Sequence, residues 1–387
     1  MMNTKHIAGR YQKPISTPMG DSAGFLRMYP DLINFSLGDP DVTTPEIIID
    51  NAYRDALAGH THYTDFYGDP ELIREILKFY KEEYNFDIEY EQVMVTTSAC
   101  HGMWLVLEAI CDPEDEIIIP TPHFTPYPYQ VKLCGGKPVF LETHEEDGFQ
   151  IDVDNLEKAI TKKTKAVIIN TPNNPTGACL NREKLIEIGK LAEKYDILII
   201  ADDIYTIYSY AEPFVPIGTL ESFFDRTITL RSFSKDYAMT GWRLGYVVAP
   251  KNLVKVIKEI NENNVFTAPS VSQRAGIAAL RNRKRVQPSL VEEFKKRTFH
   301  AYDRLKKLKN VKISEPKGTF YLFPNIKATG LSSDEIAEVL LKEAQVLILQ
   351  GNAFGAAGEG YIRIAVTVDS DMIDTAFDRI EKLKYFR

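Results

Sequence analysis

The 387-residue sequence contains few cysteines and no long apolar segment. Its four cysteines, Cys100, Cys111, Cys134 and Cys179, do not have the spacing of a zinc site or of a C-x-x-C redox motif. We therefore expect reduced thiols and predict no metal site. No hydrophobic run approaches the length of a membrane span, and the first residues lack the apolar core of a signal peptide. These absences predict a cytoplasmic protein that has no membrane partner.

The sequence also lacks an excess of positive charge. Its 46 Lys and Arg residues are outnumbered by 54 Asp and Glu residues, which gives a formal net charge of −8, and the basic residues are dispersed along the chain. Proteins that bind nucleic acids instead concentrate Lys and Arg on one face or along one helix. We therefore expect no nucleic-acid partner.

Apolar strands that alternate with helical segments fill residues 90–250. Strands are predicted at residues 93–97, 116–119, 138–141, 165–170, 197–200 and 227–230. This alternation is typical of an α/β domain with a mostly parallel sheet, and the fully apolar run at 165–170 indicates a strand buried on both faces. Residues 252–310 have a helical pattern, and residues 311–387 change to short strands with a helix at 333–344. We predict a large cofactor-binding domain of residues 45–290, with helices flanking the sheet, and a smaller α+β domain of residues 1–44 and 291–387.

The segment 232–246 combines a lysine, an arginine and hydroxyl groups at the end of a predicted buried strand. Lys235 is poorly hydrated there, which favours a neutral, nucleophilic amine that can form a Schiff base. Arg243 follows eight residues later, and a guanidinium group binds phosphate with paired hydrogen bonds. With the hydroxyl of Ser232, these groups indicate pyridoxal phosphate, which carries both an aldehyde and a phosphate. Taken alone, S-x-S-K is more often a strand end with a solvated lysine.

Other predicted strands also end in polar groups. The strand at 93–97 precedes Ser98, Ala99 and Cys100 at the start of a helix, where backbone N–H groups and the helix dipole can hold a phosphate. The strand at 197–200 leads to Asp202 and Tyr205. An acid in this position needs a charged or donor partner, and opposite a pyridine nitrogen it would keep that nitrogen protonated. Ordinary turns and helix caps explain the same patterns when each is considered alone.

The segment Ser232 to Tyr246, S-F-S-K-D-Y-A-M-T-G-W-R-L-G-Y, resembles the cofactor-lysine signature of the class I/II (fold-type I) pyridoxal-phosphate-dependent aminotransferases. The motif N-N-P-T-G at 173–177 is similar to another motif of that family. The resemblance extends over roughly residues 30–370 and includes the type, order and spacing of Asn174, Asp202, Tyr205, Ser232, Lys235, Arg243 and Arg363.

The resemblance implies a catalytic role for three residues. Lys235 would form the internal aldimine with pyridoxal 5'-phosphate and then move a proton from the substrate Cα. Asp202 would hold the pyridine nitrogen protonated, and Tyr205 would reach the phenolic oxygen of the cofactor. Asn174 would donate to the same oxygen and contribute to substrate binding.

The resemblance also implies which residues contact the cofactor, which contact the substrate and which reach the other subunit. Ser98, Ala99, Cys100, Ser232 and Arg243 would bind the cofactor, and Phe124 would stack on its ring. The Gly38 backbone would lie near the substrate carboxylate, and Arg363 would pair with that carboxylate. Tyr63 would reach the cofactor phosphate of the other subunit, so that a homodimer shares its active sites.

The sequence departs from the family pattern at three positions. Ser98 replaces a glycine, and Asp203 stands where glutamate is usual. Cys100 occupies a position that carries a basic side chain in some relatives, which puts simple recognition of acidic substrates in doubt.

These observations predict a transaminase that moves the α-amino group of an amino acid to a 2-oxo acid, of the aspartate, aromatic or broad-specificity type. One alternative is a pyridoxal-phosphate-dependent β-lyase, because the same ring chemistry serves both reactions. Another is a non-catalytic cofactor-binding regulator, although the chain has hardly any room for an additional DNA-binding domain. The aromatic residues Tyr63, Phe66, Tyr67 and Tyr127 fit an aromatic substrate and an ordinary core equally well, so the preferred amino acid stays open.

Overall fold

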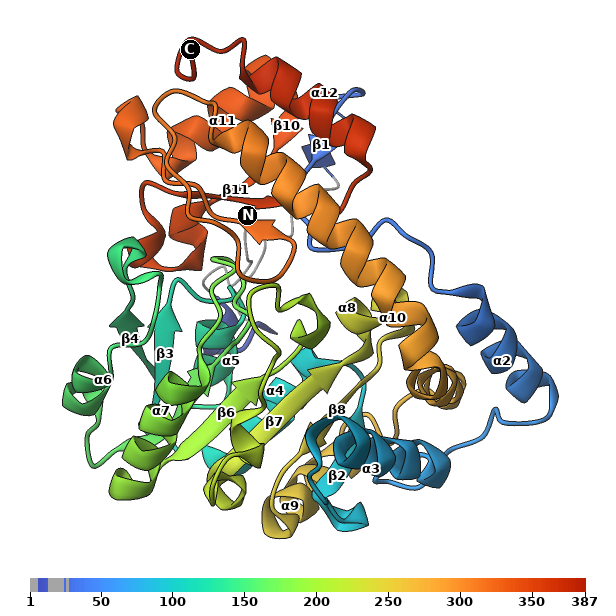
Figure 1. Cartoon of the computed structure of the whole chain (residues 1–387). Helices are drawn as coiled ribbons and strands as arrows, with labels where there is room; N and C mark the ends of the chain where they lie inside the picture. The colour runs from blue at the N-terminus through green and yellow to red at the C-terminus, as the bar shows by residue number, and fades with distance from the viewer. Residues whose placement is uncertain (1–5, 13–23, 26–27) are drawn as a thin grey trace.

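A seven-stranded, mostly parallel sheet forms the centre of the computed structural model, which describes residues 6–12, 24–25 and 28–387 (Figure 1). Strand β8 runs antiparallel to β7 and β2, and every other pair of neighbours is parallel. The predicted fold class is therefore confirmed. In spatial order the strands are β2 (Val93–Thr96), β8 (Gly245–Val248), β7 (Thr227–Ser232), β6 (Leu198–Asp202), β5 (Thr164–Ile169), β3 (Glu116–Thr121) and β4 (Lys137–Glu142).

Helices cover both faces of this sheet. Successive strand residues point to opposite faces, so Ile200 packs in the core beside α4 (Ala99–Ile110), α5 (Tyr127–Leu133) and α9 (Lys251–Glu262), whereas Ile199 packs in the core beside α6 (Val153–Ala159) and α7 (Arg182–Tyr195). Figure 1 shows α7 in front of the sheet and α4 behind it. Burial of both faces explains why the central strands are almost entirely apolar.

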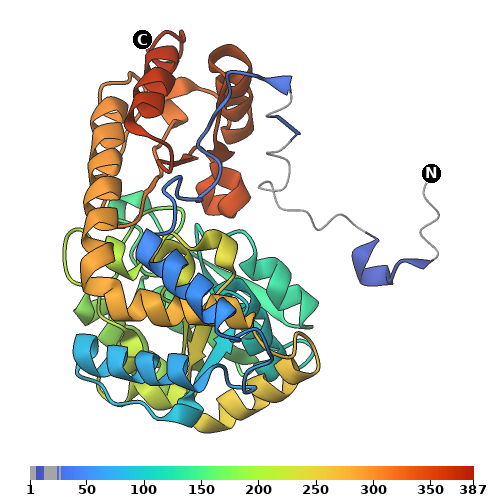
Figure 2. The same ribbon diagram turned by 90° about the vertical axis from the view of Figure 1, so that its right-hand side faces the viewer.

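Helix α10 (Ser270–Leu305) connects the sheet region to the C-terminal part of the chain. It is 36 residues long and packs against α2 (Glu46–Leu57) and α3 (Pro70–Tyr84) in one part and against α12 (Ser370–Ile380) in another. Figure 2 shows it running along one side of the molecule, from the sheet region to the C-terminal elements. The predicted domain limit near residue 290 therefore falls inside one continuous helix.

A smaller α+β unit lies at the other end of α10. Its strands are β1 (Ile33–Asn34), which pairs in parallel with β10 (Val346–Leu347), and the antiparallel set β11 (Leu349–Gln350), β12 (Ile362–Ala365) and β9 (Tyr321–Leu322). Helices α11 (Ser333–Ala344) and α12 contribute to the same core, which includes Phe35 and Phe377. The domain limits 45–290, 1–44 and 291–387 remain a prediction, and residues 1–5, 13–23 and 26–27 lie outside the described residues.

The structure contains two helical elements that the sequence analysis did not predict. The proline-rich segment after β3 contains helix α5, and Pro128 lies in its first turn, where the missing N–H costs nothing. Lys235 lies in the single helical turn α8 (Phe233–Asp236). Within the described ranges, no helix is long and apolar enough to cross a bilayer. The cytoplasmic location remains a prediction.

The contact between α7 and Phe223 yields a test of this packing. A Cβ atom added at Gly189 would lie 2.3 Å from the ring of the fully buried Phe223. We therefore expect Gly189→Ala to lower the free energy of unfolding by about 1–3 kcal/mol, although alanine is the better helix former. Urea denaturation measures the change. Lys190→Ala, on the exposed side of the same helix, is the control and should stay within about 0.5 kcal/mol of the parent; equal effects of the two substitutions would contradict the packing.

Candidate active site

A cavity of about 310 Å³ opens at the carboxyl ends of the parallel strands. Such crevices are where open α/β sheets bind ligands. The cavity walls come from the large sheet and from the smaller α+β unit. It is lined by every residue predicted for the site except Tyr63: Gly38, Ser98, Ala99, Cys100, Phe124, Asn174, Asp202, Tyr205, Ser232, Lys235, Arg243 and Arg363.

The Lys235 side chain enters this cavity from α8, directly after β7. Its Nζ donates a hydrogen bond to the carbonyl oxygen of Gly38, which comes from the smaller unit. Burial lowers the pKa of Lys235 to about 8; the negative charge of Asp39 opposes this shift, and the positive charges of Arg363 and Arg243 add to it. A substantial fraction of this amine is therefore neutral near physiological pH.

Asp202 lies at the end of β6 with one of its two carboxylate oxygens uncommitted. The hydroxyl of Tyr127, on α5, donates to Oδ2, whereas Oδ1 is buried without a partner in the described part of the chain. Burial raises the pKa of Asp202 to about 6, and the bond from Tyr127 opposes that shift. A buried carboxylate oxygen without a donor is suited to a ligand that brings its own N–H group.

Arg363 is a fully buried cation in the otherwise apolar strand β12. Its Nη1 donates to Asn174 Oδ1 at 3.1 Å, and its Nη2 donates to the carbonyl oxygen of Ser36. The guanidinium carbon lies 4.7 Å from the ring centroid of Tyr321, while Nε has no partner within the described ranges. Burial lowers the pKa of Arg363. A buried guanidinium group that lacks a carboxylate partner is suited to bind an acidic ligand.

The start of α4 forms a cradle of backbone N–H groups. Ser98 is the N-cap of α4 and has φ 89° and ψ 156°, a conformation that favours glycine. This conformation explains why glycine is the usual residue at this position in the family that the sequence resembles, whereas this chain has serine. A Cβ atom at Gly245 would lie 2.6 Å from the Ala99 nitrogen, so glycine allows β8 to approach the cradle closely. Arg243 lines the same cavity, and its Nη1 donates to the Thr240 carbonyl at 2.8 Å.

Tyr63 does not reach the cavity within one chain. Its side chain is 80% exposed, and its ring packs edge-on against Phe266 with centroids 4.8 Å apart. It lines a different, open cavity together with Thr97, the residue just before Ser98. Its predicted role therefore requires a second subunit.

Several residues of the cavity wall were not predicted from the sequence, among them Tyr127, Tyr321 and Asp39. Tyr127 was considered only as a general aromatic residue, and neither Tyr321 nor Asp39 was assigned a role. The Tyr321 hydroxyl lies 3.0 Å from that of Tyr205, and a Cβ atom at Gly38 would overlap the Tyr321 hydroxyl at 1.7 Å. Tyr127 is the first residue of α5, so its contact with Asp202 depends on a helix that the sequence analysis did not predict.

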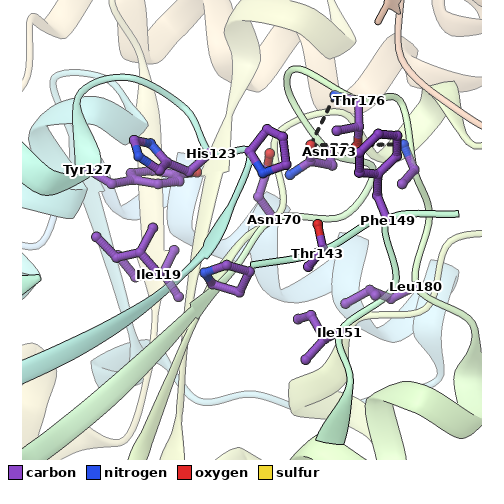
Figure 3. Close-up of a pocket in the computed structure, with 14 residues that line it drawn as sticks. Ile119, His123, Tyr127, Thr143, Phe149, Ile151, Asn170, Asn173, Thr176 and Leu180 are labelled. Carbon is purple, nitrogen blue, oxygen red and sulfur yellow. Dashed lines mark hydrogen bonds between the residues drawn. The ribbon is translucent and has the colours of Figure 1, made fainter. Parts of the chain in front are cut away.

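A second cavity, of about 30 Å³, lies beside the N-N-P-T-G segment (Figure 3). Figure 3 shows Asn173 and Thr176 joined by hydrogen bonds on one side of this cavity, with His123 and Tyr127 on the other. The Asn173 side chain accepts from both the backbone nitrogen and the hydroxyl of Thr176, at 3.1 Å and 2.8 Å. Asn173 therefore shapes the loop, and Asn174 is the asparagine that faces the larger cavity. Among the described residues, no group of three His, Cys, Asp or Glu side chains could hold a metal ion.

Comparison with known proteins adds to this geometry. Residues 30–380 match the family model described as aminotransferase class I and II. The sequence is 39% identical over 358 residues to an aspartate aminotransferase of Pyrococcus horikoshii, covering 91% of this chain and 90% of the relative. It is 38% identical over 356 residues to aromatic-amino-acid aminotransferase 2 of Thermococcus litoralis, covering 91% of each protein. The fold is similar to the crystal structure of an aromatic aminotransferase from Pyrococcus horikoshii, with a TM-score of 0.89, 36% identity, and coverage of 93% of this chain and 97% of that one.

Asp39 and Arg363 carry opposite charges near Lys235, so substituting each one tests how these charges shift the pKa of Lys235. Asp39→Asn removes a negative charge that favours the ammonium form, so we expect the pKa of Lys235 to fall below about 8. Arg363→Gln removes a positive charge that disfavours that form, so we expect the pKa to rise. The pH dependence of Lys235 modification by a small acylating reagent, followed by peptide mass spectrometry on ligand-free protein, measures both. The exposed Lys190 in the same samples is the control, and a shift in the same direction for both variants would refute the assignment.

Proposed function

Because this chain belongs to the class I and II aminotransferase family and is therefore an aminotransferase, we propose that it binds pyridoxal 5'-phosphate in the cavity at the strand ends. It would use this cofactor to move the α-amino group of an amino acid to a 2-oxo acid. The observation that carries the proposal is the buried amine of Lys235 in the same cavity as the unpaired carboxylate oxygen of Asp202 and the buried guanidinium of Arg363.

The residues of the cavity fit this cofactor. The backbone N–H groups of Ala99 and Cys100, together with Ser232 and Arg243, are suited to a phosphate. The N–H of Ser98 already donates to the Thr96 carbonyl oxygen at 2.9 Å, so Ser98 would contribute through its hydroxyl instead. The free Oδ1 of Asp202 can accept from a protonated pyridine nitrogen, which is the donor that this buried atom lacks. Phe124, also in the cavity wall, presents an aromatic ring for stacking on the cofactor. When bound, the cofactor supplies an electron sink that makes the Cα–H bond of an amino acid acidic.

Lys235 is proposed to move the proton at the substrate Cα. Its pKa of about 8 gives it both a neutral and a charged form near neutral pH, as a group that accepts and returns a proton requires. The bonds of Arg363 to Asn174 and to the Ser36 carbonyl hold its guanidinium in place. A substrate α-carboxylate bound to Arg363 would then be oriented with its Cα near Lys235. Tyr205 is proposed to donate to the phenolic oxygen of the cofactor.

A homodimer with shared active sites is part of the proposal. The side chains of Ile49, Tyr53 and Leu57 on α2 are 36%, 64% and 72% exposed, and Tyr63 follows them at 80%. They place large apolar side chains on one helix and the loop after it, and the half-exposed Phe266, which follows α9, packs against Tyr63. Exposed apolar groups of this size typically mark a protein interface. A second copy on this surface would bring a Tyr63 toward the phosphate cradle of its partner, since Tyr63 and Thr97 line one cavity.

For the substrate we propose aromatic or broad specificity, with aspartate as the alternative. The basic side chains of the cavity wall are Lys235, Arg243 and Arg363, and each has a proposed role with the cofactor or the α-carboxylate. A second substrate carboxylate therefore has no cation of its own in the described part of this chain. Apolar residues such as Leu37, Met103 and Phe124 offer contacts to an uncharged side chain instead.

The central test is a half-reaction with pyridoxal phosphate bound. Phenylalanine, tyrosine and aspartate are each added to the enzyme, and the cofactor spectrum and the released 2-oxo acid are measured. We expect turnover with the aromatic amino acids, and we expect Lys235→Ala to bind the cofactor but to lose turnover by several orders of magnitude. Borohydride should attach the cofactor to the peptide that contains Lys235. Release of ammonia with pyruvate would instead indicate a β-lyase, and attachment to another peptide would refute the assignment of Lys235.

The proposed role of Arg363 predicts a selective defect in Arg363→Lys. A lysine is a point charge and cannot form the two parallel bonds of a guanidinium group. One charged hydrogen bond contributes about 1.5–3 kcal/mol, so kcat/KM for amino acids should fall about tenfold or more. Stopped-flow absorbance measures the half-reaction, and the spectrum of the bound cofactor without substrate should be unchanged. Normal reaction of this variant with α-amino acids would show that Arg363 is only structural.

The shared site predicts complementation between two defective variants. Tyr63→Ala and Lys235→Ala are each expected to have low activity. Mixed dimers contain one site in which both groups are intact, so refolding the two variants together should restore up to about a quarter of the parent activity, the statistical limit for random pairing. Refolding each variant alone is the control, and absence of any recovery in demonstrably mixed dimers would exclude a shared site.

A further inference from the structure

A buried, charged cluster lies behind the lysine, outside the cavity wall. It consists of Arg231, Asp203, Asp236, Thr206 and Tyr84, and is called the Arg231 cluster below. The first four are only 4%, 1%, 2% and 8% exposed. None of the five lines the cavity that holds Lys235. Burying charges in this way is costly, so the cluster calls for an explanation beyond general stability.

Thr206 binds Asp236 directly, and the guanidinium group of Arg231 lies against both. Arg231 Nη1 donates to the hydroxyl of Tyr84 at 2.9 Å, and Nη2 donates to Thr206 Oγ1 at 3.1 Å. Thr206 Oγ1 in turn donates to Asp236 Oδ2 at 2.9 Å, an atom that lies 3.6 Å from Arg231 Nη2. The threonine hydroxyl therefore accepts from the cation and donates to the anion.

Four of the five members of this cluster are sequence neighbours of site residues. Asp203 follows Asp202, Thr206 follows Tyr205, and Asp236 follows Lys235. Arg231 precedes Ser232 on β7, where adjacent side chains point to opposite faces. The bonds of the cluster therefore connect the backbone segments that carry the proposed catalytic groups.

The short turn that follows Tyr205 forms hydrogen bonds with two adjacent residues of α8, Lys235 and Asp236. The turn η6 (Thr206–Tyr208) follows Tyr205 directly. Its Thr206 binds the side chain of Asp236, and the hydroxyl of its Tyr208 donates to the carbonyl oxygen of Lys235 at 3.0 Å. Because α8 is a single turn, these two bonds fix the orientation of its backbone relative to Tyr205.

The charges of the cluster favour Asp236 as the ionised partner of Arg231. Burial raises the pKa of Asp236 to about 6, and the positive charge of Arg231 opposes the shift. Burial raises the pKa of Asp203 to about 8, Arg231 opposes this, and the nearby Asp202 and Asp236 add to it. Asp236 is also the acid that lies 3.6 Å from Arg231 Nη2, so it is the carboxylate that pairs with this cation.

We propose that Thr206 and Asp236, held by Arg231, are positioning residues that set the direction in which Lys235 enters the cavity. The proposal rests on the function proposed above for Lys235. The residues act through the backbone of α8, since none of them touches the cavity. A small rotation of this turn would move the Lys235 amine away from the substrate Cα, and displacements of about 1 Å can lower a rate by about a hundredfold.

Thr206→Val tests the proposal, because valine keeps the shape of threonine and loses the hydroxyl. With pyridoxal phosphate bound, we expect kcat for the amino-acid half-reaction to fall about tenfold or more while KM changes little. We expect Thr206→Ser, which keeps the hydroxyl, to restore the rate to within about threefold of the parent. A readout independent of turnover is the rate at which borohydride fixes the cofactor to Lys235, which should also fall in Thr206→Val.

Thr227→Val is the matched control. Thr227 lies at the start of the strand that leads to Lys235, is fully buried, and donates one hydrogen bond to the Phe223 carbonyl at 2.7 Å. Its substitution should lower the melting temperature about as much as Thr206→Val but leave kcat and the borohydride reaction unchanged. If Thr206→Val likewise loses only thermal stability, the Arg231 cluster is merely structural and the proposal is wrong.

Two further variants test the proposal if Thr206→Val does not fold, and separate its failure from a failure of the proposed function. If Thr206→Val does not fold, Arg231→Met combined with Asp236→Leu replaces the ion pair by apolar groups of similar size, a change that is often neutral for stability. This folded double variant should still show the loss in kcat, and parent-like turnover would overturn the proposal. Lys235→Ala is measured in parallel. Turnover by Lys235→Ala would refute the proposed function itself, whereas an inactive Lys235→Ala beside a normal Thr206→Val would refute only the positioning role.

Discussion

The proposed active site depends on keeping one lysine amine out of water. Desolvation disfavours the charged form of an amine, and burial is accordingly the largest influence on the pKa of Lys235. The parallel sheet provides this burial, because helices cover both of its faces and its strands end at a common edge. An exposed lysine at the same edge would stay protonated and would not be a nucleophile at neutral pH.

The same constraint explains why the site is assembled from two parts of the chain. Gly38, Tyr321 and Arg363 come from segments that pack in or beside the smaller α+β unit, and they close the cavity over Lys235. Several polar bonds cross this boundary, among them one from Lys235 to the Gly38 carbonyl and one from Arg363 to Asn174. The long helix α10 contacts elements of both parts, so it couples their positions.

The sequence predicted the features that depend on local patterns. Continuous apolar runs identified the central strands, because strands buried on both faces leave no polar alternation. The residues at the ends of these strands, such as Asn174, Asp202 and Lys235, were brought together because parallel strands share a carboxyl edge. Arg363 was singled out by the family resemblance, and the structure shows it fully buried in an otherwise apolar strand.

Features that depend on tertiary contacts were missed. Helix α5 was hidden by prolines, and with it the bond from Tyr127 to Asp202. The approach of Tyr321 to Gly38 joins segments nearly 300 residues apart, and no local pattern predicts such a contact. The exposed Tyr63 cannot be placed from one chain, because its proposed partner belongs to a second subunit.

Successive side chains along a strand point to opposite faces of the sheet, so the adjacent acids Asp202 and Asp203 lie in different surroundings. Ile200 and Leu230 pack on the α4 side of the sheet, so Asp202 and Ser232, two residues further along their strands, continue on that side into the cavity. Asp203 and Arg231 point the other way and are buried near one another. One carboxylate thus retains an oxygen for a ligand in the cavity, whereas the other belongs to a cluster that contacts only protein. A one-residue shift in the register of β6 would exchange these roles, and the apolar residues that fix the register of β6 therefore also decide which acid faces the cavity.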